Sequence, residues 1–481
     1  MVKPNHNRSS SVGIHSVYSA IGVFGLTSGL IYLFNFKFDK LVPDFSHKTN
    51  IHVYVLLFLL LNALYLVGVF LVLRNKSTIG RSKGLLGIIL FFAVVFRLCL
   101  VPMDPVVLSK DMYRFIWDGR VQQSGINPYQ YPPAAEELQT LRDERIYPNI
   151  NRKDYPTLYP AGAQIFFRIS YALVGDSVFG FKSLLVLFDI LTLLVLTALL
   201  NVYRYEATRL ILYAWNPLVI FEISYSGHLD GITVFFMAAA LYLTALRQKI
   251  PAIIMLAFAS AIKLYPALLL AAILNRGERI KGLITFSCTF VLFYLPYITA
   301  GDKISGFLPI YLKNPYESFN LGLKNLIMHL FPGLSYYFLS QIFILTLAAA
   351  GTIFFFRYKQ SDMVLRSAYI LTALLILLMP SSLHPWYVIL IIPFLAFYPC
   401  AGWLIFSCTV SLSYLKYVSN QGIMPTWVLL AEYLPLFTLI AAGFIIRKIT
   451  IGGAEIQSSA QPPSELNSSP WDTRFPRRGV N

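Results

Sequence analysis

Apolar runs of membrane-spanning length divide this sequence, and the short polar segments between them are rich in Lys and Arg. The run at 51–73 contains no Asp, Glu, Lys or Arg, and RNKSTIGRSK follows it with four basic residues and no acid. A helix needs about 20 apolar residues to cross a bilayer, and only a helix or a closed barrel satisfies its backbone hydrogen bonds there. The pattern predicts an all-α integral membrane protein, a multispanning bundle of about 12–14 transmembrane helices.

Composition and charge placement support this class. Hydrophobic residues make up 57% of the chain and charged residues 13%, against about 25% charged in an average soluble domain. The net charge of +16 comes from Lys and Arg in short loops. This placement is typical of cytoplasmic loops that face anionic lipid, whereas a nucleic-acid binder gathers its basic residues on one soluble face. We therefore expect membrane lipids as partners and no nucleic acid.

The same reasoning divides the chain into regions. Residues 1–13 are expected to be a cytoplasmic N-terminus, 14–450 a transmembrane domain, and 451–481 a disordered cytoplasmic tail rich in Ser and Pro. The polar loop at 102–159 holds seven Lys and Arg against eight Asp and Glu, unlike the basic loops assigned to the inside. This first large loop is therefore predicted to be extracytoplasmic.

The loop contains DMYRFIWDGRVQQ, in which a helix would align four polar side chains. Asp111, Arg114, Asp118 and Gln122 follow at spacings of three, four and four, so they share one face. Two carboxylates with an arginine between them suit general-base chemistry. The spacing leaves open whether Asp111 or Asp118 is the base, and Trp117 on the other side is a candidate site residue or an interfacial anchor.

Asp111 has a local reason to be ionised. Ser109 is a natural N-cap residue, which would place Asp111 in the first helical turn. The partial positive charge of the helix N-terminus favours a carboxylate there.

Later segments bring further polar groups to the same predicted side of the membrane. SGHLDG places His228 and Asp230 at the outer end of a run broken at Asn216-Pro217, and SSLHPWY supplies His384 and Trp386. The second outer loop near Glu317 to Asn320 belongs to the same group, and Lys263 in AIKLYP would reach this level if a broken pair of short helices forms around Pro266. Convergence of such groups predicts a site, although the histidines could be satisfied core residues and the aromatic residues interfacial anchors.

Other charged residues have structural interpretations. Arg120 and the acids from Glu136 to Glu144 are expected on a solvated loop surface. Lys182 and Asp189, seven residues apart in one apolar run, suggest a buried pair or a transport path.

DMYRFIWDGRVQQSGINPY followed by YPTLYPAGAQIFF resembles the first outer loop of the multispanning GT-C glycosyltransferases. WNPLVIFEISYSGHLDG, AIKLYPALLL and SSLHPWYVILIIPF resemble further landmarks of the bacterial α-mannosyltransferase branch, which is similar to glycosyltransferase family 87. The landmarks appear in the expected order.

The resemblance implies transfer of a hexose, expected to be mannose, from a polyprenyl-phosphate donor to a hydroxyl of a glycan, glycolipid or other acceptor. It also implies inversion at the anomeric carbon and a bacterial inner membrane with the active site facing the periplasm. By position the base falls on Asp111, with Asp118 as competitor, and Arg114, Lys263 or His384 would meet the phosphate. No cofactor or metal is expected, and no Cys or His pattern with metal-ligand spacing occurs.

The sequence is also compatible with two other classes of protein. A multispanning transporter or lipid flippase would use the broken segments and intramembrane charges as a path. A non-catalytic homologue would act as a membrane scaffold. The long polar outer loop favours the enzyme.

Overall fold

The computed structural model describes residues 7–35, 47–75, 82–103, 108–309, 319–357, 361–419 and 422–459. Within these ranges every regular element is a helix. Seven helices are long and apolar enough to cross a membrane: His15–Phe34, Ile51–Arg74, Lys83–Leu100, Val178–Val202, Arg276–Ser305, Tyr336–Phe356 and Thr426–Ile445. Five shorter apolar helices accompany them, at Ala161–Val174, Asp230–Ala245, Lys249–Ile262, Met363–Leu377 and Pro385–Leu395. The chain is a multispanning helical membrane protein, and the full count of spans stays a prediction.

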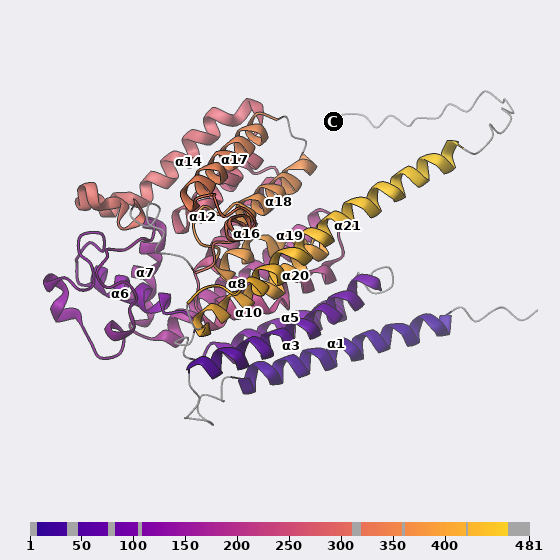
Figure 1. Ribbon diagram of the computed structural model, residues 1–481, viewed down its shortest axis with the longest axis horizontal. Helices are drawn as coiled ribbons and strands as arrows, with labels where there is room; N and C mark the ends of the chain where they lie inside the picture. The colour runs from indigo at the N-terminus through magenta and orange to yellow at the C-terminus, as the bar shows by residue number, and fades with distance from the viewer. Residues whose placement is uncertain are drawn as a thin grey trace, which may run out of the picture.

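The first helices pack side by side along one flank of the bundle (Figure 1): α1 (Asn7–Asn35), α3 (His47–Arg74) and α5 (Lys83–Leu100). Helix α21 (Thr426–Ser459) lies next to this group in Figure 1 and packs against α20 (Ala401–Thr409). Helix α21 covers residues 451–459, where disorder was expected, and the rest of the predicted tail lies outside the described residues.

The polar loop forms a cluster at one end of the long helices (Figure 1). The loop contains α6 (Asp111–Gln123), η1 (Glu136–Leu141) and η2 (Tyr147–Asn149), and α7 (Ala161–Val174) follows it and packs against α6. Helix α7 has 14 residues, about 21 Å, and so is shorter than the hydrocarbon core of about 30 Å. Helices α6 and α7 approach closely at Gly119, where a Cβ would lie 2.6 Å from the carbonyl oxygen of Phe167.

The middle of the chain contains the two interruptions that the sequence predicted. After α8 (Val178–Val202), the Asn216-Pro217 step separates α9 (Ile211–Ala214) from α10 (Pro217–Ile220), and Asn216 caps α10 by accepting hydrogen bonds from two backbone N–H groups. The second interruption follows α12 (Lys249–Ile262) and precedes η5 (Tyr265–Leu269) and α13 (Leu270–Ile273). Both breaks are therefore confirmed.

The remaining elements complete the bundle: η3 (Ala207–Leu210), η4 (Phe221–Tyr225), α11 (Asp230–Ala245), η6 (Arg276–Glu278), α14 (Arg279–Tyr294), η7 (Leu295–Ser305), α16 (Leu323–Leu330), α17 (Tyr336–Phe356), α18 (Ser361–Leu377), η8 (Pro385–Ile391), α19 (Ile392–Leu395) and η9 (Val410–Val418).

The pairing of Lys182 with Asp189 was wrong. Asp189 instead accepts a charged hydrogen bond from Nε of Arg97 at 2.6 Å and one from the hydroxyl of Tyr213 at 2.7 Å. Lys182 donates to the carbonyl oxygens of Leu100 and Met103 at 2.9 and 2.6 Å. The side chains of Asp189 and Lys182 therefore link helix α8 to α5 and to the residues at the C-terminal end of α5. Both buried charges thus have a structural role.

Candidate active site

Helix α6 begins at Asp111, so this carboxylate lies in the first turn as expected. The capping residue differs from the prediction, because Lys110 occupies the N-cap position and Ser109 accepts only the N–H of Asp111, at 3.3 Å. The Asp111 carboxylate is oriented from outside the helix, since Nδ2 of Asn151 donates to its Oδ1 at 2.6 Å. Its side chain is 24% exposed.

Asp111 lines a cavity of about 810 Å³ formed by segments that are far apart in the sequence. Six of the nine predicted site residues line it: Asp111, Arg114, His228, Lys263, His384 and Trp386. The other three, Asp118, Trp117 and Asp230, lie outside the cavity lining. The predicted outer-side convergence therefore gathers most of the expected groups around one space, while Glu317 lies outside the described residues.

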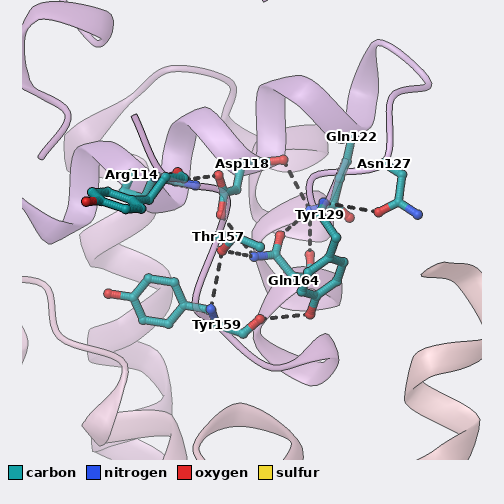
Figure 2. Close-up of polar contacts among 9 residues, drawn as sticks. Arg114, Asp118, Gln122, Asn127, Tyr129, Thr157, Tyr159 and Gln164 are labelled. Atoms are coloured by element: carbon teal, nitrogen blue, oxygen red, sulfur yellow. Dashed lines mark hydrogen bonds and ion pairs between the residues drawn. The ribbon is translucent and has the colours of Figure 1, made fainter. Parts of the chain in front are cut away.

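Asp118 is held in a buried network behind Arg114 (Figure 2). It accepts from Nε of Arg114 at 2.8 Å and from Nε2 of Gln164 at 2.9 Å. Gln164 also donates to Thr157, and Gln122 on α6 donates to the side-chain oxygen of Gln164 at 2.9 Å. The two acids predicted on one face thus have different environments: Asp111 faces the cavity and Asp118 orients an arginine.

Trp117 packs away from the cavity. The residue is 1% exposed, and its ring centroid lies 5.5 Å from that of Tyr147. The guanidinium carbon of Arg120 lies 5.7 Å from the centroid of the Trp117 ring. This position fits a role in packing η2 on α6 and leaves no open face for a sugar.

Asp230 does not line the cavity but positions two residues that do. Its carboxylate accepts from Nζ of Lys263 at 2.6 Å and from the hydroxyl of Tyr265 at 2.5 Å. Both donors line the cavity and lie at the break after α12. The acid of SGHLDG therefore fixes the ammonium group that AIKLYP contributes.

The two histidines sandwich a tryptophan. Trp386 stacks on His228 with centroids 3.8 Å apart and on His384 with centroids 4.2 Å apart, and Phe319 stacks on the outer face of His384 at 5.0 Å. Burial lowers the pKa of both imidazoles, to about 3 for His384, so both rings are neutral. Positive charge in the cavity lining then comes from Lys and Arg side chains.

Sequence reasoning missed several residues of this site. Asn151 and Arg152 follow one another in the loop, and Arg152 lines the cavity at a backbone φ of 51°, a left-handed conformation uncommon for a residue other than glycine. Glu222, fully buried behind His228, is a third. An acid inside the apolar run WNPLVIFEISY was a usable signal, because an intramembrane carboxylate usually faces the bundle interior.

The expectation of a solvated surface was wrong for Arg120, whereas the side chain of Asp143 is 33% exposed and pairs with Arg120. Arg120 is 8% exposed and donates to Asp143 at 3.0 Å and to Asp176 at 2.7 Å. Partial burial raises the pKa of Asp143, but the hydrogen bonds from Arg120 and from the N–H groups of Tyr147 and Ile146 outweigh it and lower this pKa to about 2. Glu136, Glu137 and Glu144 are exposed as predicted.

No group of three or more side chains suited to metal binding occurs among the residues that the structure describes. The chemistry on which the site can draw consists of one partly exposed carboxylate, nearby cationic groups and several aromatic faces.

Comparison with known proteins adds a family assignment. Residues 16–275, more than half of the chain, match the family described as alpha-(1->6)-mannopyranosyltransferase, N-terminal domain. No curated protein and no solved structure matches the chain. The matched part contains Asp111, Glu222, His228 and Lys263, whereas His384 and Trp386 lie beyond it. The chain belongs to this alpha-(1->6)-mannopyranosyltransferase family and is a mannosyl-transferring membrane glycosyltransferase.

Proposed function

We propose that the protein transfers mannose from a polyprenyl-phosphate donor to an acceptor hydroxyl, with inversion, on the extracytoplasmic side of the bacterial inner membrane, in the manner of GT-C enzymes. The observation that carries this proposal is the Asp111 carboxylate, held by Asn151 in a cavity that also presents cationic and aromatic side chains. Asp111 serves as the general base, and Asp118 serves as a positioning residue for Arg114.

The donor phosphate would be met by the cations of the lining. Arg114 offers a forked guanidinium held by Asp118, and Lys263 offers an ammonium held by Asp230. His384 is neutral and can contribute a hydrogen bond. In the transfer step a lone pair of the acceptor oxygen forms the bond to the anomeric carbon while the sugar–phosphate bond breaks toward the phosphate. Asp111 takes the acceptor proton, and one displacement inverts the anomer.

The sugar would lie against aromatic faces of the lining. Trp386, Tyr387, Tyr265 and Tyr155 all border the cavity. Aromatic rings offer apolar surfaces, and the hydroxyl groups of tyrosines add hydrogen-bonding positions.

An apolar groove next to the cavity supports a lipid-linked donor. This groove of about 520 Å³ shares Leu264, Tyr265, Leu347 and Leu375 with the cavity and continues over small and apolar residues of α13, α14 and α17. No Asp, Glu, Lys, Arg or His lines it among the described residues. An isoprenoid chain could bind in this groove with its phosphate at the cations of the cavity, because burial of its apolar surface favours binding there.

Charge and placement support the proposed sidedness. The cluster that bears Asp111 lies at one end of the long helices (Figure 1), and its loop is nearly balanced in charge. The basic loops fall in other connections, which supports a cytoplasmic position for those. The transporter alternative is weaker, since Lys182, Asp189 and Lys263 all have structural partners.

The test is mannosyl transfer in membranes that contain the wild type, Asp111→Asn or Asp118→Asn, supplied with polyprenyl-phosphate mannose and host lipids. Removal of the base is expected to lower the rate about a hundredfold or more in Asp111→Asn at unchanged expression. Asp154→Asn, at an exposed acid of the same loop, is the matched control and is expected to keep wild-type activity.

Two outcomes would contradict the proposal. Full activity in Asp111→Asn would remove the base assignment. A wild type that is inactive with polyprenyl-phosphate mannose but transfers mannose from a nucleotide-linked donor would exclude the lipid-linked donor class.

A further inference from the structure

The backbone around Glu222 is built to bring this acid beside His228. In a regular α-helix these two positions would lie about 120° apart around the axis. Residues Phe221–Tyr225 instead form a π-helical turn, and Gly227 follows at a φ of 75°, so that the N–H of His228 reaches the carbonyl oxygen of Glu222 at 3.0 Å. π-Helical turns recur at functional sites.

The result is a close approach of two buried groups. Nε2 of His228 lies 3.4 Å from Oε2 of Glu222, and the side chains are 2% and 0% exposed. The other oxygen of Glu222 accepts from the hydroxyl of Tyr414 at 2.7 Å. Neither Oε2 of Glu222 nor Nε2 of His228 makes a hydrogen bond in the described structure, so each faces mainly the other. Buried polar atoms in this state need an explanation.

The opposite nitrogen of the same ring faces the proposed base. Nδ1 of His228 lies 3.9 Å from Oδ2 of Asp111. Asn151 holds the other oxygen of Asp111, and Trp386 stacks on the imidazole, so the carboxylate and the ring plane are both fixed. Glu222, His228 and Asp111 therefore lie in a row, acid–imidazole–acid, from the buried interior to the cavity.

We propose that His228 and Glu222 are positioning residues that relay the proton taken up by Asp111 into the protein interior. This inference rests on the proposed function. Asp111 first accepts the proton of the acceptor hydroxyl as the new glycosidic bond forms. It then passes that proton to Nδ1 of His228 while the Nε2 proton moves to Oε2 of Glu222, which leaves Asp111 ionised again. After the product leaves, the two transfers reverse and Asp111 returns the proton to water in the cavity.

The relay needs one tautomer of His228, with the proton on Nε2. Glu222 favours that tautomer in its ionised form, which accepts from Nε2–H and cannot donate. Burial raises the pKa of Glu222 to about 8, so the relay operates from the ionised fraction, and kcat is expected to rise as the pH increases through about 8. The separations of 3.4 and 3.9 Å are longer than hydrogen bonds. Such contacts commonly shorten once substrate is bound.

Glu222→Gln is the decisive variant, because the glutamine amide keeps the shape and can donate to Nε2, which selects the opposite tautomer. We expect kcat for mannosyl transfer to fall about tenfold to a hundredfold while KM for polyprenyl-phosphate mannose and for acceptor stays within about twofold. Glu222→Asp, which keeps the carboxylate, is expected to recover part of kcat. The matched control is Glu432→Gln, at a second fully buried glutamate, which accepts from the amide of Asn320 and lies outside the cavity lining.

The second measurement is a double-variant cycle with His228→Gln. A relay predicts that the double variant loses no more kcat than the more affected single variant, because the two residues act as one unit. Losses that multiply would overturn the inference, as would a kcat of Glu222→Gln equal to that of Glu432→Gln. An inactive wild type with this donor would instead refute the proposed function. Thermal unfolding in detergent checks folding, and His228→Gln alone against wild type tests the relay if Glu222→Gln does not fold.

Discussion

Asp118→Ala separates a structural acid from a chemical one. The variant removes the acceptor of Nε of Arg114 and of Nε2 of Gln164, at 2.8 and 2.9 Å. The side chain of Arg114 is 6% exposed, so it would stay buried without its acid. Leaving one member of a buried pair uncompensated destabilises by about 3–5 kcal/mol. Since Arg114 keeps its hydrogen bond to the carbonyl oxygen of Tyr155, the lower end of about 3 kcal/mol is expected.

The assay is unfolding of the purified protein in mixed micelles, together with kcat of the folded fraction. Asp118→Ala should lower the free energy of unfolding and reduce kcat in part, because Arg114 is no longer aimed at the cavity. Asp154→Ala, at the exposed acid, should change stability by less than about 0.5 kcal/mol. Unchanged stability with complete loss of transfer would refute the reasoning and make Asp118 a direct participant in the reaction.

Two further predictions concern charges outside the cavity. Because the pKa of Asp143 is lowered to about 2, its contribution to loop stability is fully present above the unfolded pKa of about 4 and is lost as the pH falls through about 2. Cleavage of the wild-type loop by an acid-active protease should therefore increase only near pH 2. In Asp143→Asn the same increase in cleavage should occur already at higher pH. Arg97→Met leaves the Asp189 carboxylate buried without its cation and should lower the free energy of unfolding by about 3–5 kcal/mol, part of which Asp189→Asn in the same chain should recover.

The sequence predicted the features that depend on periodicity and on proline. Apolar run length identified the membrane-spanning helices, Asn216-Pro217 and Pro266 marked both breaks, and spacing placed Asp111 on a helix. Partners were harder to predict, because an ion pair depends on which helices become neighbours. Lys182 and Asp189 share a face of α8, yet contacts with α5 decide the partner of each. Arg120 was misassigned for the same reason, since Asp176 reaches it from beyond α7.

The proximity of Glu222 to His228 could not be predicted from helical periodicity. Its distance from His228 depends on a π-helical turn and a left-handed glycine, and helical periodicity assigns the two side chains to different faces. The composition of the run gave only the hint that a carboxylate in an apolar segment needs a partner. A turn of this kind breaks the regular hydrogen-bond ladder, so its persistence requires support from tertiary packing, here the close contact of Gly227 with Met112 on α6. The helix that carries Asp111 thus also holds in place the turn that orients His228 toward Asp111, which couples the position of the proposed base to that of its relay.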